Sequence, residues 1–245
     1  MAPVSKPIDV GNVIRRVLAV YAKRGILVIL IALAISVIVA GLDAVVRGVR
    51  VVALLALPYT FIGDALLIGM LVALAADMED GRGDAGIEQL AGAVRPVLGR
   101  LILVSVVAGV GILIGLVLLV IPGLILLTIW AVSHPVVMLE QPPNLRALGR
   151  SRDLVRGNAW PVFGVIFVPY ILVLVINGAA GPHHLEGATT TFAVAVVVGT
   201  LIAPVRALLA ASLYFELRRS ASASSADHGT VDPNGVTAQR SAGRA

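Results

Sequence analysis

The sequence predicts an all-α polytopic membrane protein with six transmembrane helices and three cytoplasmic amphipathic helices at the membrane surface. Three observations lead to this fold class. Apolar residues make up 58% of the 245 residues and the mean hydropathy is +0.98, which is more apolar surface than a soluble domain can bury. Several apolar runs approach the roughly 20 residues that cross a bilayer. Shorter segments with one basic and one apolar side recur between them.

The first predicted elements are an amphipathic helix over residues 8–24 and a span over residues 26–46. Apolar positions of the helix recur every three or four residues, while Arg15 and Arg16 fall on the opposite arc. Such a helix suits the plane of an anionic leaflet. We read the span as an uncleaved anchor and not a signal peptide, because five further spans follow it.

The second span covers residues 54–76 and carries Asp64 near its middle. A second amphipathic helix over residues 85–99 then leads into a third span over residues 101–121. The chain therefore returns to the same side of the membrane before it ascends again.

Glycine and proline mark the third span and its connection to the fourth, residues 123–138. Gly111 and Gly115 form a small-xxx-small pair, which lets helix backbones approach closely, either inside the chain or at a dimer interface. Only Pro122 and Gly123 separate the two apolar runs, so we expect a tight outer hairpin there.

The third amphipathic helix, residues 145–156, is rich in arginine and is stopped by Gly157. The fifth and sixth spans follow over residues 160–179 and 190–214. Residues 1–218 thus form one membrane domain, and residues 219–245, which lack an apolar period, are expected to be a disordered cytoplasmic tail. The arginines of this helix, with Arg15 and Arg16, are candidate contacts for anionic lipid or a partner protein: Arg146, Arg150, Arg152 and Arg156.

The distribution of Lys and Arg predicts the orientation. Fourteen of them lie in the segments predicted to be inside, and two, Arg47 and Arg50, lie in the outer loops. By the positive-inside rule both termini are cytoplasmic, and the protein is placed in the cell membrane. Each amphipathic helix precedes an ascending span, a tight outer turn and a descending span, so the chain reads as three hairpin repeats. Any protein with an even number of spans needs inner loops, which is the simpler explanation.

Pro122, Gly123 and Glu140 precede the second inner loop, and Arg150, Ser151 and Gly157 follow within it. Together they resemble the membrane domain attached to some glycerophosphoryl diester phosphodiesterases and related uncharacterised six-helix bacterial membrane proteins. The resemblance runs roughly over residues 8–219 and implies the six-helix fold, but it indicates no activity. The catalytic part of those enzymes is a separate soluble barrel of roughly 250 residues. We see no such domain in this sequence and predict no enzyme. The residues that carry the resemblance are Pro122, Gly123, Glu140, Arg150, Ser151 and Gly157.

This sequence departs from the family pattern at two places. Gln141-Pro142-Pro143 stands where the family has a glycine-containing turn, and Arg206 lies inside the last span. A charge at the bilayer centre costs about 2.5–3.5 kcal/mol on insertion scales unless it finds a partner or water. Asp64 and Arg206 lie at matching depths, roughly 18–20 Å from the inner face at 1.5 Å per residue. An ion pair between the second and sixth spans is therefore feasible, and the alternatives are a structural pair, a polar translocation or ligand site, and no contact.

Two further polar features of the sequence are His134 in the fourth span and a histidine-containing outer loop. His134, followed by Pro135, suits a hydrogen bond near loosened backbone or a proton relay. His183, His184 and Glu186 in an outer loop lack the fixed spacing of a metal site. The absence of cysteine excludes thiolate sites, and no motif indicates a metal or cofactor, so none is predicted.

Two functions follow from these patterns. The first is a non-enzymatic scaffold or regulatory subunit that contacts anionic lipid, and a cytoplasmic protein partner, through its basic helices. The second is a small transporter or lipid-handling protein with a polar site at Asp64 and Arg206. A polar cavity open to one side would favour the second function, and a dry, close-packed bundle would favour the first. The basic excess reflects topology, so no nucleic-acid partner is expected.

Overall fold

The computed structural model describes residues 8–46, 53–179 and 188–229, and the regular structure in these ranges is all helical. Five of the described helices are long and apolar enough to cross a membrane, or six if one bent pair counts as a single span. The prediction of an all-α chain with several membrane-spanning helices is thus confirmed. The elements are α1 (Val10–Val46), α2 (Ala53–Glu79), α3 (Ile87–Val94), the 3₁₀ turn η2 (Arg95–Val97), α4 (Leu98–Leu118), α5 (Val120–Ile129), α6 (Ser133–Glu140), α7 (Arg146–Val155), α8 (Ala159–Ala179) and α9 (Ala188–Gly229).

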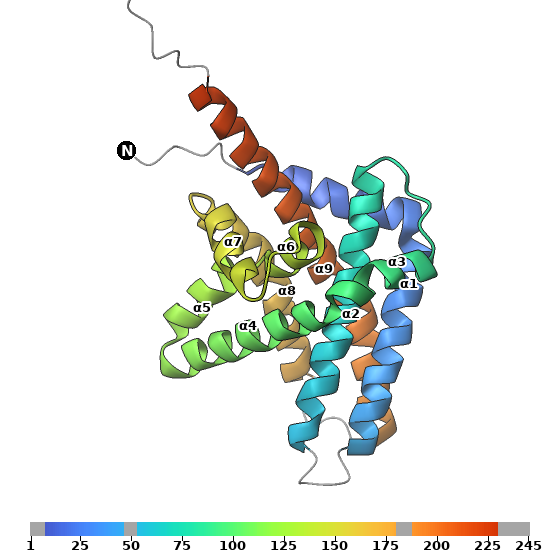
Figure 1. The fold of residues 1–245 in the computed structure, drawn as a ribbon. Coiled ribbons are helices and arrows are strands. Elements are labelled where there is room, and N and C mark those ends of the chain that lie inside the picture. Colours follow the sequence, from blue (N-terminus) through green and yellow to red (C-terminus); the bar gives the residue numbers. More distant parts are fainter. Residues whose placement is uncertain (1–7, 47–52, 180–187, 230–245) are drawn as a thin grey trace, which may run out of the picture.

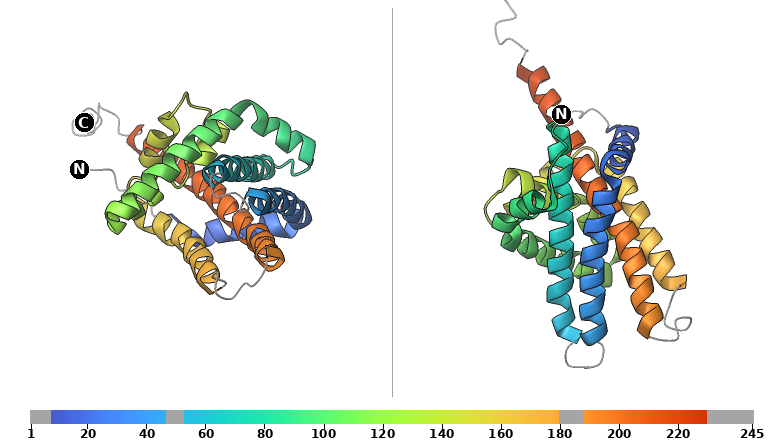
Figure 2. Two further views of the ribbon diagram at one scale, coloured as in Figure 1. Left: turned by 90° about the horizontal axis from the view of Figure 1, so that it is seen from below. Right: turned by 90° about the vertical axis from the view of Figure 1, so that its right-hand side faces the viewer.

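Helices α1, α2, α8 and α9 run side by side, while the α4–α5 hairpin leans away from them (Figures 1 and 2). Helix α1 packs chiefly along α9, and α2 packs against both. Short helix α7 lies at one end of this bundle, which we call the α7 end. Helices α1 and α8 finish at the opposite end (Figure 1).

The helical geometry changes at the three places where an amphipathic helix was predicted to meet a span. Helix α1 leaves helical geometry at Arg24 (φ −133°, ψ 21°), and the Nε of Arg24 donates to the Gly83 carbonyl at 2.7 Å. Turn η2 joins α3 to α4, and α7 meets α8 at 112° through Gly157, whose φ is +91°. Helices therefore exist at these three positions. Their location on a cytoplasmic surface and the threefold repeat remain predictions.

The hairpin between α4 and α5 turns at Leu119, so its predicted place at Pro122 and Gly123 is wrong. Leu119 has extended backbone (φ −155°, ψ 125°), and Pro122 and Gly123 already belong to the first turn of α5. A proline fits there because the first N–H groups of a helix have no partner inside it.

The glycines of this hairpin allow a close approach within the chain. A Cβ on Gly115 would lie 2.9 Å from the backbone of Gly123, and one on Gly111 would lie 2.7 Å from the Trp130 ring. Of the two alternatives left open by the small-xxx-small pattern, these contacts support packing inside the chain.

The fourth span is not one continuous helix as predicted, because it breaks between Ile129 and Ser133. Pro135 has no N–H to bond the Ala131 carbonyl, and its ring crowds that carbonyl. The chain therefore ends α5, makes a short turn and starts α6 with Pro135 in its first turn.

The predicted disordered tail is also corrected in part. Helix α9 continues to Gly229, well into the stretch that was expected to lack structure. Extending an existing helix avoids the cost of nucleation, and alanine and arginine in this stretch favour it. Residues 230–245 lie outside the described part of the chain.

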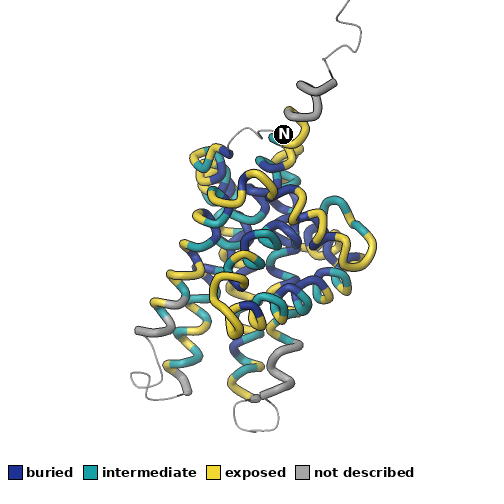
Figure 3. The backbone as a smooth tube through the Cα atoms, turned by 90° about the vertical axis from the view of Figure 1, so that its left-hand side faces the viewer, coloured by how far each residue is buried: buried dark blue, intermediate teal, exposed yellow. Residues whose placement is uncertain are grey.

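The core occupies the half of the bundle nearer α7. Helices are lined there by buried residues, whereas their opposite ends are mostly intermediate or exposed (Figure 3). The tip of the α4–α5 hairpin is apolar and exposed, with Val117 at 77% and Leu118 at 73%. The largest fully buried side chains are Tyr214, Leu71, Leu74, Leu101, Leu208, Leu213 and Leu217.

Candidate intramembrane site

The break between α5 and α6 leaves backbone groups that one side chain satisfies. The Ile129 carbonyl would normally accept from Ser133, but the Ser133 N–H bonds Trp130 instead, at 3.1 Å. The hydroxyl of Ser151 on α7 donates to the Ile129 carbonyl at 2.8 Å and accepts from the Val132 N–H at 3.3 Å. Ser151 thereby fixes the turn that presents Ser133 and His134.

His134 is held by Ser105 on α4, at 2.8 Å between Nε2 and Oγ. Ser105 gives its only hydroxyl hydrogen to the Leu101 carbonyl, also at 2.8 Å. Nε2 must therefore be the donor to Ser105, which leaves Nδ1 as an acceptor in the neutral ring. Nδ1 has no hydrogen-bond partner among the residues that the structure describes.

Asp64 on α2 and Arg206 on α9 form the predicted ion pair, with 3.4 Å between Oδ2 and Nη2. The guanidinium of Arg206 also lies over the Tyr170 ring, 5.3 Å from its centre. This stacking keeps Arg206 beside an aromatic face that attracts cations. The side chains of Asp64 and Arg206 are 51% and 25% exposed, so neither is sealed in the core.

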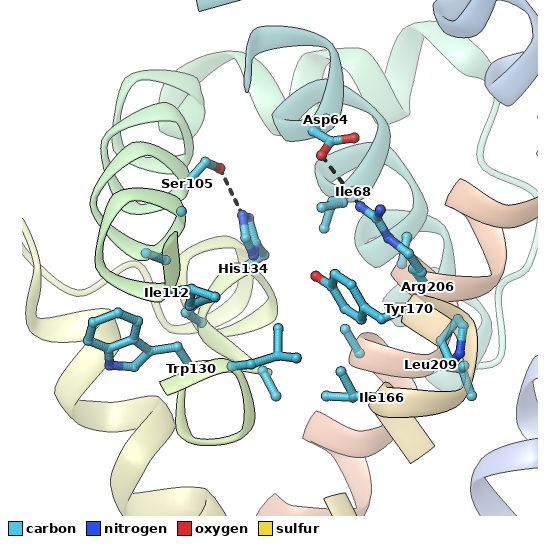
Figure 4. A pocket seen from close by; sticks show the side chains of 18 of the residues that line it. Asp64, Ile68, Ser105, Ile112, Trp130, His134, Ile166, Tyr170, Arg206 and Leu209 are labelled. Carbon is cyan, nitrogen blue, oxygen red and sulfur yellow. Dashed lines mark hydrogen bonds and ion pairs between the residues drawn. The ribbon is translucent and has the colours of Figure 1, made fainter. Parts of the chain in front are cut away.

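These groups surround a cavity of about 180 Å³, which we call the central cavity (Figure 4). Its lining comes from α2, α4, α5, α6, α8 and α9, and the Tyr170 hydroxyl points into it. The Ser133 hydroxyl is fully buried and has no partner within the described ranges. The polar lining residues are Asp64, Ser105, Ser133, His134, Tyr170 and Arg206, set among apolar and aromatic side chains that include Phe61, Ile112 and Trp130.

Asp64 also borders a second cavity of about 310 Å³, the α1–α9 cavity, on the other side of the ion pair. Ser36, Asp43 and Thr60 contribute polar groups to its lining, and Asp43 accepts a hydrogen bond from Tyr59 at 3.0 Å. The carboxylate of Asp64 is therefore shared by two polar spaces between the long helices.

Two of the six arginines predicted to contact lipid or a partner are engaged within the chain. Arg16 is only 17% exposed and pairs with Glu79 and Glu216, each at 2.9 Å, and Arg219 also bonds Glu79. Arg16 therefore joins α1, α2 and α9, and its prediction as a surface contact is wrong. The amphipathic pattern could not reveal the distant carboxylates.

Arg150 binds Glu140 through Nε at 2.8 Å, and the Tyr214 hydroxyl donates to the same carboxylate at 3.0 Å. The hydrogen bond to Glu140 raises the pKa of Arg150, against an opposing effect of burial. Together with Ser151 and Gly157, this contact ties α7 to α6 and α9. Glu140, Arg150, Ser151 and Gly157 thus hold a junction and line neither cavity.

The other four arginines are exposed on the outer surface: Arg15, Arg146, Arg152 and Arg156. Arg15 lies near Asp9, at 3.9 Å, whereas the three from α7 make no ion pair within the described residues. These three remain candidates for lipid or partner contact.

Sequence reasoning missed Ser105, Ser133, Tyr170 and Tyr214 as members of polar contacts. Serine and tyrosine are common in membrane helices, so the sequence alone does not single these residues out. Their contacts do: Ser105 bonds His134, Tyr170 lies under Arg206, and Tyr214 bonds Glu140. His183, His184 and Glu186 lie outside the described residues. The described ranges contain no group of three or more His, Cys, Asp and Glu side chains that could hold a metal ion.

Comparisons with family models, curated proteins and solved structures found no match to this chain.

Proposed function

We propose that this protein is a multi-pass transporter of the cell membrane that admits a small polar solute to the central cavity. The observation that carries the proposal is the convergence of an ion pair, an unprotonated histidine nitrogen and an unpaired serine hydroxyl on one space among the described helices. Polar groups inside a membrane are costly and commonly mark a solute or ion pathway. Of the two functions predicted, this cavity favours the transporter.

The lining fits a solute that carries both charges. Asp64 and Arg206 neutralise one another, so a solute with a single charge would leave one intramembrane charge unpaired. A zwitterion can exchange partners with the pair: its carboxylate takes Arg206 and its ammonium takes Asp64. His134 Nδ1 then accepts, and Ser133 donates, a hydrogen bond.

The size and the second cavity support passage of a small solute. About 180 Å³ holds several waters or one small organic molecule. Because Asp64 borders both cavities, partner exchange at Asp64 would hand the solute from one space to the other.

The exposed basic residues support the α7 end as the cytoplasmic end. Arg146, Arg152 and Arg156 would contact anionic lipid there, each cation contributing about 1 kcal/mol near the surface. Glu140, Arg150, Ser151 and Gly157 hold the α6–α7–α8 junction, which supports a shared fold with the membrane domains that the sequence resembles.

The proposal is tested with the full chain in liposomes, using glycine as the smallest zwitterionic probe. Stopped-flow light scattering in a glycine gradient should show faster solute entry than in empty liposomes, and no faster entry of sucrose. His134→Ala and Asp64→Asn should each slow glycine entry several-fold, because each removes a group that faces the solute.

Arg219→Gln is the matched control, since it breaks an ion pair to Glu79 outside the cavity and should leave entry unchanged. The exchanged variant Asp64→Arg with Arg206→Asp separates stability from transport. Normal folding of the exchanged variant would show that the reversed pair still stabilises the protein. Glycine entry in the parent protein that is no faster than in empty liposomes would contradict the transporter proposal.

A further inference from the structure

A further concavity, separate from the central cavity and the α1–α9 cavity, lies between α5 and the first turns of α8. This α5–α8 groove has a volume of about 290 Å³. Its one hydroxyl side chain, Thr128, donates to the Leu124 carbonyl of its own helix at 2.8 Å, so this hydroxyl offers no free donor. The groove therefore suits an apolar occupant. Its lining residues are Ile121, Leu124, Ile125, Thr128, Ile129, Ala159, Trp160 and Phe163.

Aromatic rings form the α8 side of the groove. Trp160 is 83% exposed and meets Phe163 edge-on at 6.2 Å, and Phe163 stacks on Phe167 at 4.8 Å. An exposed indole at the start of an apolar helix is typical of the boundary between headgroups and hydrocarbon. The groove thus begins at the depth where a lipid headgroup meets its acyl chains.

Two basic residues lie close along the chain to the end of the groove at Ile129 and Ala159. Ser151 on α7 bonds the carbonyl of Ile129, a groove residue, at 2.8 Å, and Arg152 is the next residue along α7. Arg156 precedes the groove residue Ala159 by three positions, within about 10 Å along the chain. Both guanidinium groups are exposed and make no ion pair within the described residues.

The charge balance at this end stays positive. Asp153 is exposed beside the two arginines and offsets one of them. The first turn of α8 adds the partial positive charge of a helix N-terminus, and its N–H groups at Ala159 and Trp160 precede the first intrahelical bond, from Val162 to Asn158. An anion at this position meets arginine side chains and a helix terminus together.

We propose that the α5–α8 groove with Arg152 and Arg156 is a binding site for one anionic glycerophospholipid. An acyl chain fills the groove, and the phosphate lies against the guanidinium groups, which suit phosphate by charge and by their fork of donors. A zwitterionic lipid carries an ammonium group that the arginines repel. This site is separate from the central cavity and does not depend on transport.

The two tryptophans of the chain make a direct test possible. In Trp130→Phe the remaining tryptophan is Trp160, inside the proposed site. The full-length variant is reconstituted in vesicles that mix unlabelled lipid with phosphatidylglycerol or phosphatidylcholine whose chains are brominated, and quenching of Trp160 gives the relative affinity of the two lipids. Phosphatidylglycerol should be preferred, and Arg152→Gln and Arg156→Gln should each reduce the preference about five-fold.

Matched variants separate the site from its surroundings. Arg95→Gln, which changes an exposed arginine of turn η2 outside the groove, should leave the preference unchanged, and Arg152→Lys with Arg156→Lys should retain most of it. Ala159→Phe should fill the groove and reduce quenching by both lipids, whereas Val168→Phe, on exposed α8 surface outside the groove, should not.

Equal quenching by the two lipids in the parent would overturn the proposal. So would a preference that survives loss of both arginines, or one that Arg95→Gln reduces as strongly, because the attraction would then be diffuse. If the double glutamine variant does not fold, the Arg156→Gln single variant and a measurement in about 1 M salt, where charges are screened beyond about 3 Å, decide the same question.

Discussion

A single hydroxyl group holds the turn that presents the candidate site. Ser151 supplies the donor and the acceptor that the backbone lost when Pro135 interrupted the helix. His134 and Ser133 depend on that turn for their positions, although Ser151 itself lines neither cavity.

Removing that hydroxyl should destabilise the protein without altering the cavity lining. Ser151→Ala leaves the Ile129 carbonyl and the Val132 N–H unpaired in a buried place, at a cost of about 1–3 kcal/mol. The midpoint of thermal unfolding in detergent should fall by several degrees. Ser222→Ala, an exposed serine bonded to Arg218, should change the midpoint little. An unchanged midpoint in Ser151→Ala would contradict the role given to this hydroxyl.

The contact made by an individual residue could be predicted only where a charged residue lies in an apolar segment. Asp64 and Arg206 are charges in apolar runs at equal depth, so their pairing could be predicted, and it occurs. Arg16 gave the opposite result, because an arginine on an amphipathic helix has the same pattern whether it faces lipid or distant carboxylates. Ser133 has no such signal, since its importance depends on a turn that only packing defines.

At the scale of elements, the α4–α5 hairpin depends on two glycines in contact. Gly115 faces the backbone of Gly123, and backbone atoms cannot move aside as a flexible side chain can. The hairpin carries Ser105 and Trp130 to the central cavity, so its packing also shapes the site.

A methyl group at this contact should separate the two helices. Gly115→Ala places a Cβ 2.9 Å from Gly123 and should destabilise the protein by about 1–3 kcal/mol through overpacking. Gly99→Ala, in the same helix but in open space, should instead be neutral or stabilise by up to about 1 kcal/mol. Chemical unfolding in mixed micelles compares the two variants. A loss of equal size in both would show that the close contact has no special weight.

Helix boundaries were predictable where a residue forbids helix or permits a left-handed turn. Gly157 ended α7 as expected, with φ at +91°. The turn at Leu119 could not be found, because leucine is no turn residue and the extended backbone there follows from the packing of Gly115 on Gly123. Pro135 was expected only to loosen the backbone of the fourth span and not to break its helix. In a sequence, a proline near the start of a helix looks the same as one inside a span.

At the scale of the whole molecule, the two ends of the bundle differ in how firmly they are held. Arg16, Glu79, Glu216 and Arg219 join α1, α2 and α9 near the α7 end, where the core is also concentrated. The central cavity and the α1–α9 cavity lie among the same long helices and share Asp64. Helices fixed at one end and separated by polar spaces are suited to small movements around an ion pair.

The central claim is that the central cavity holds water and a small polar solute, and cysteine accessibility tests it most directly. The chain has no cysteine, so Ala108→Cys, which lines the cavity, and Ala211→Cys, which is buried and lines neither cavity, each report alone. With a small charged methanethiosulfonate reagent, we predict that Ala108→Cys reacts, that glycine slows the reaction, and that Ala211→Cys stays unmodified. Two equally unreactive cysteines would mean a dry bundle and would contradict the account.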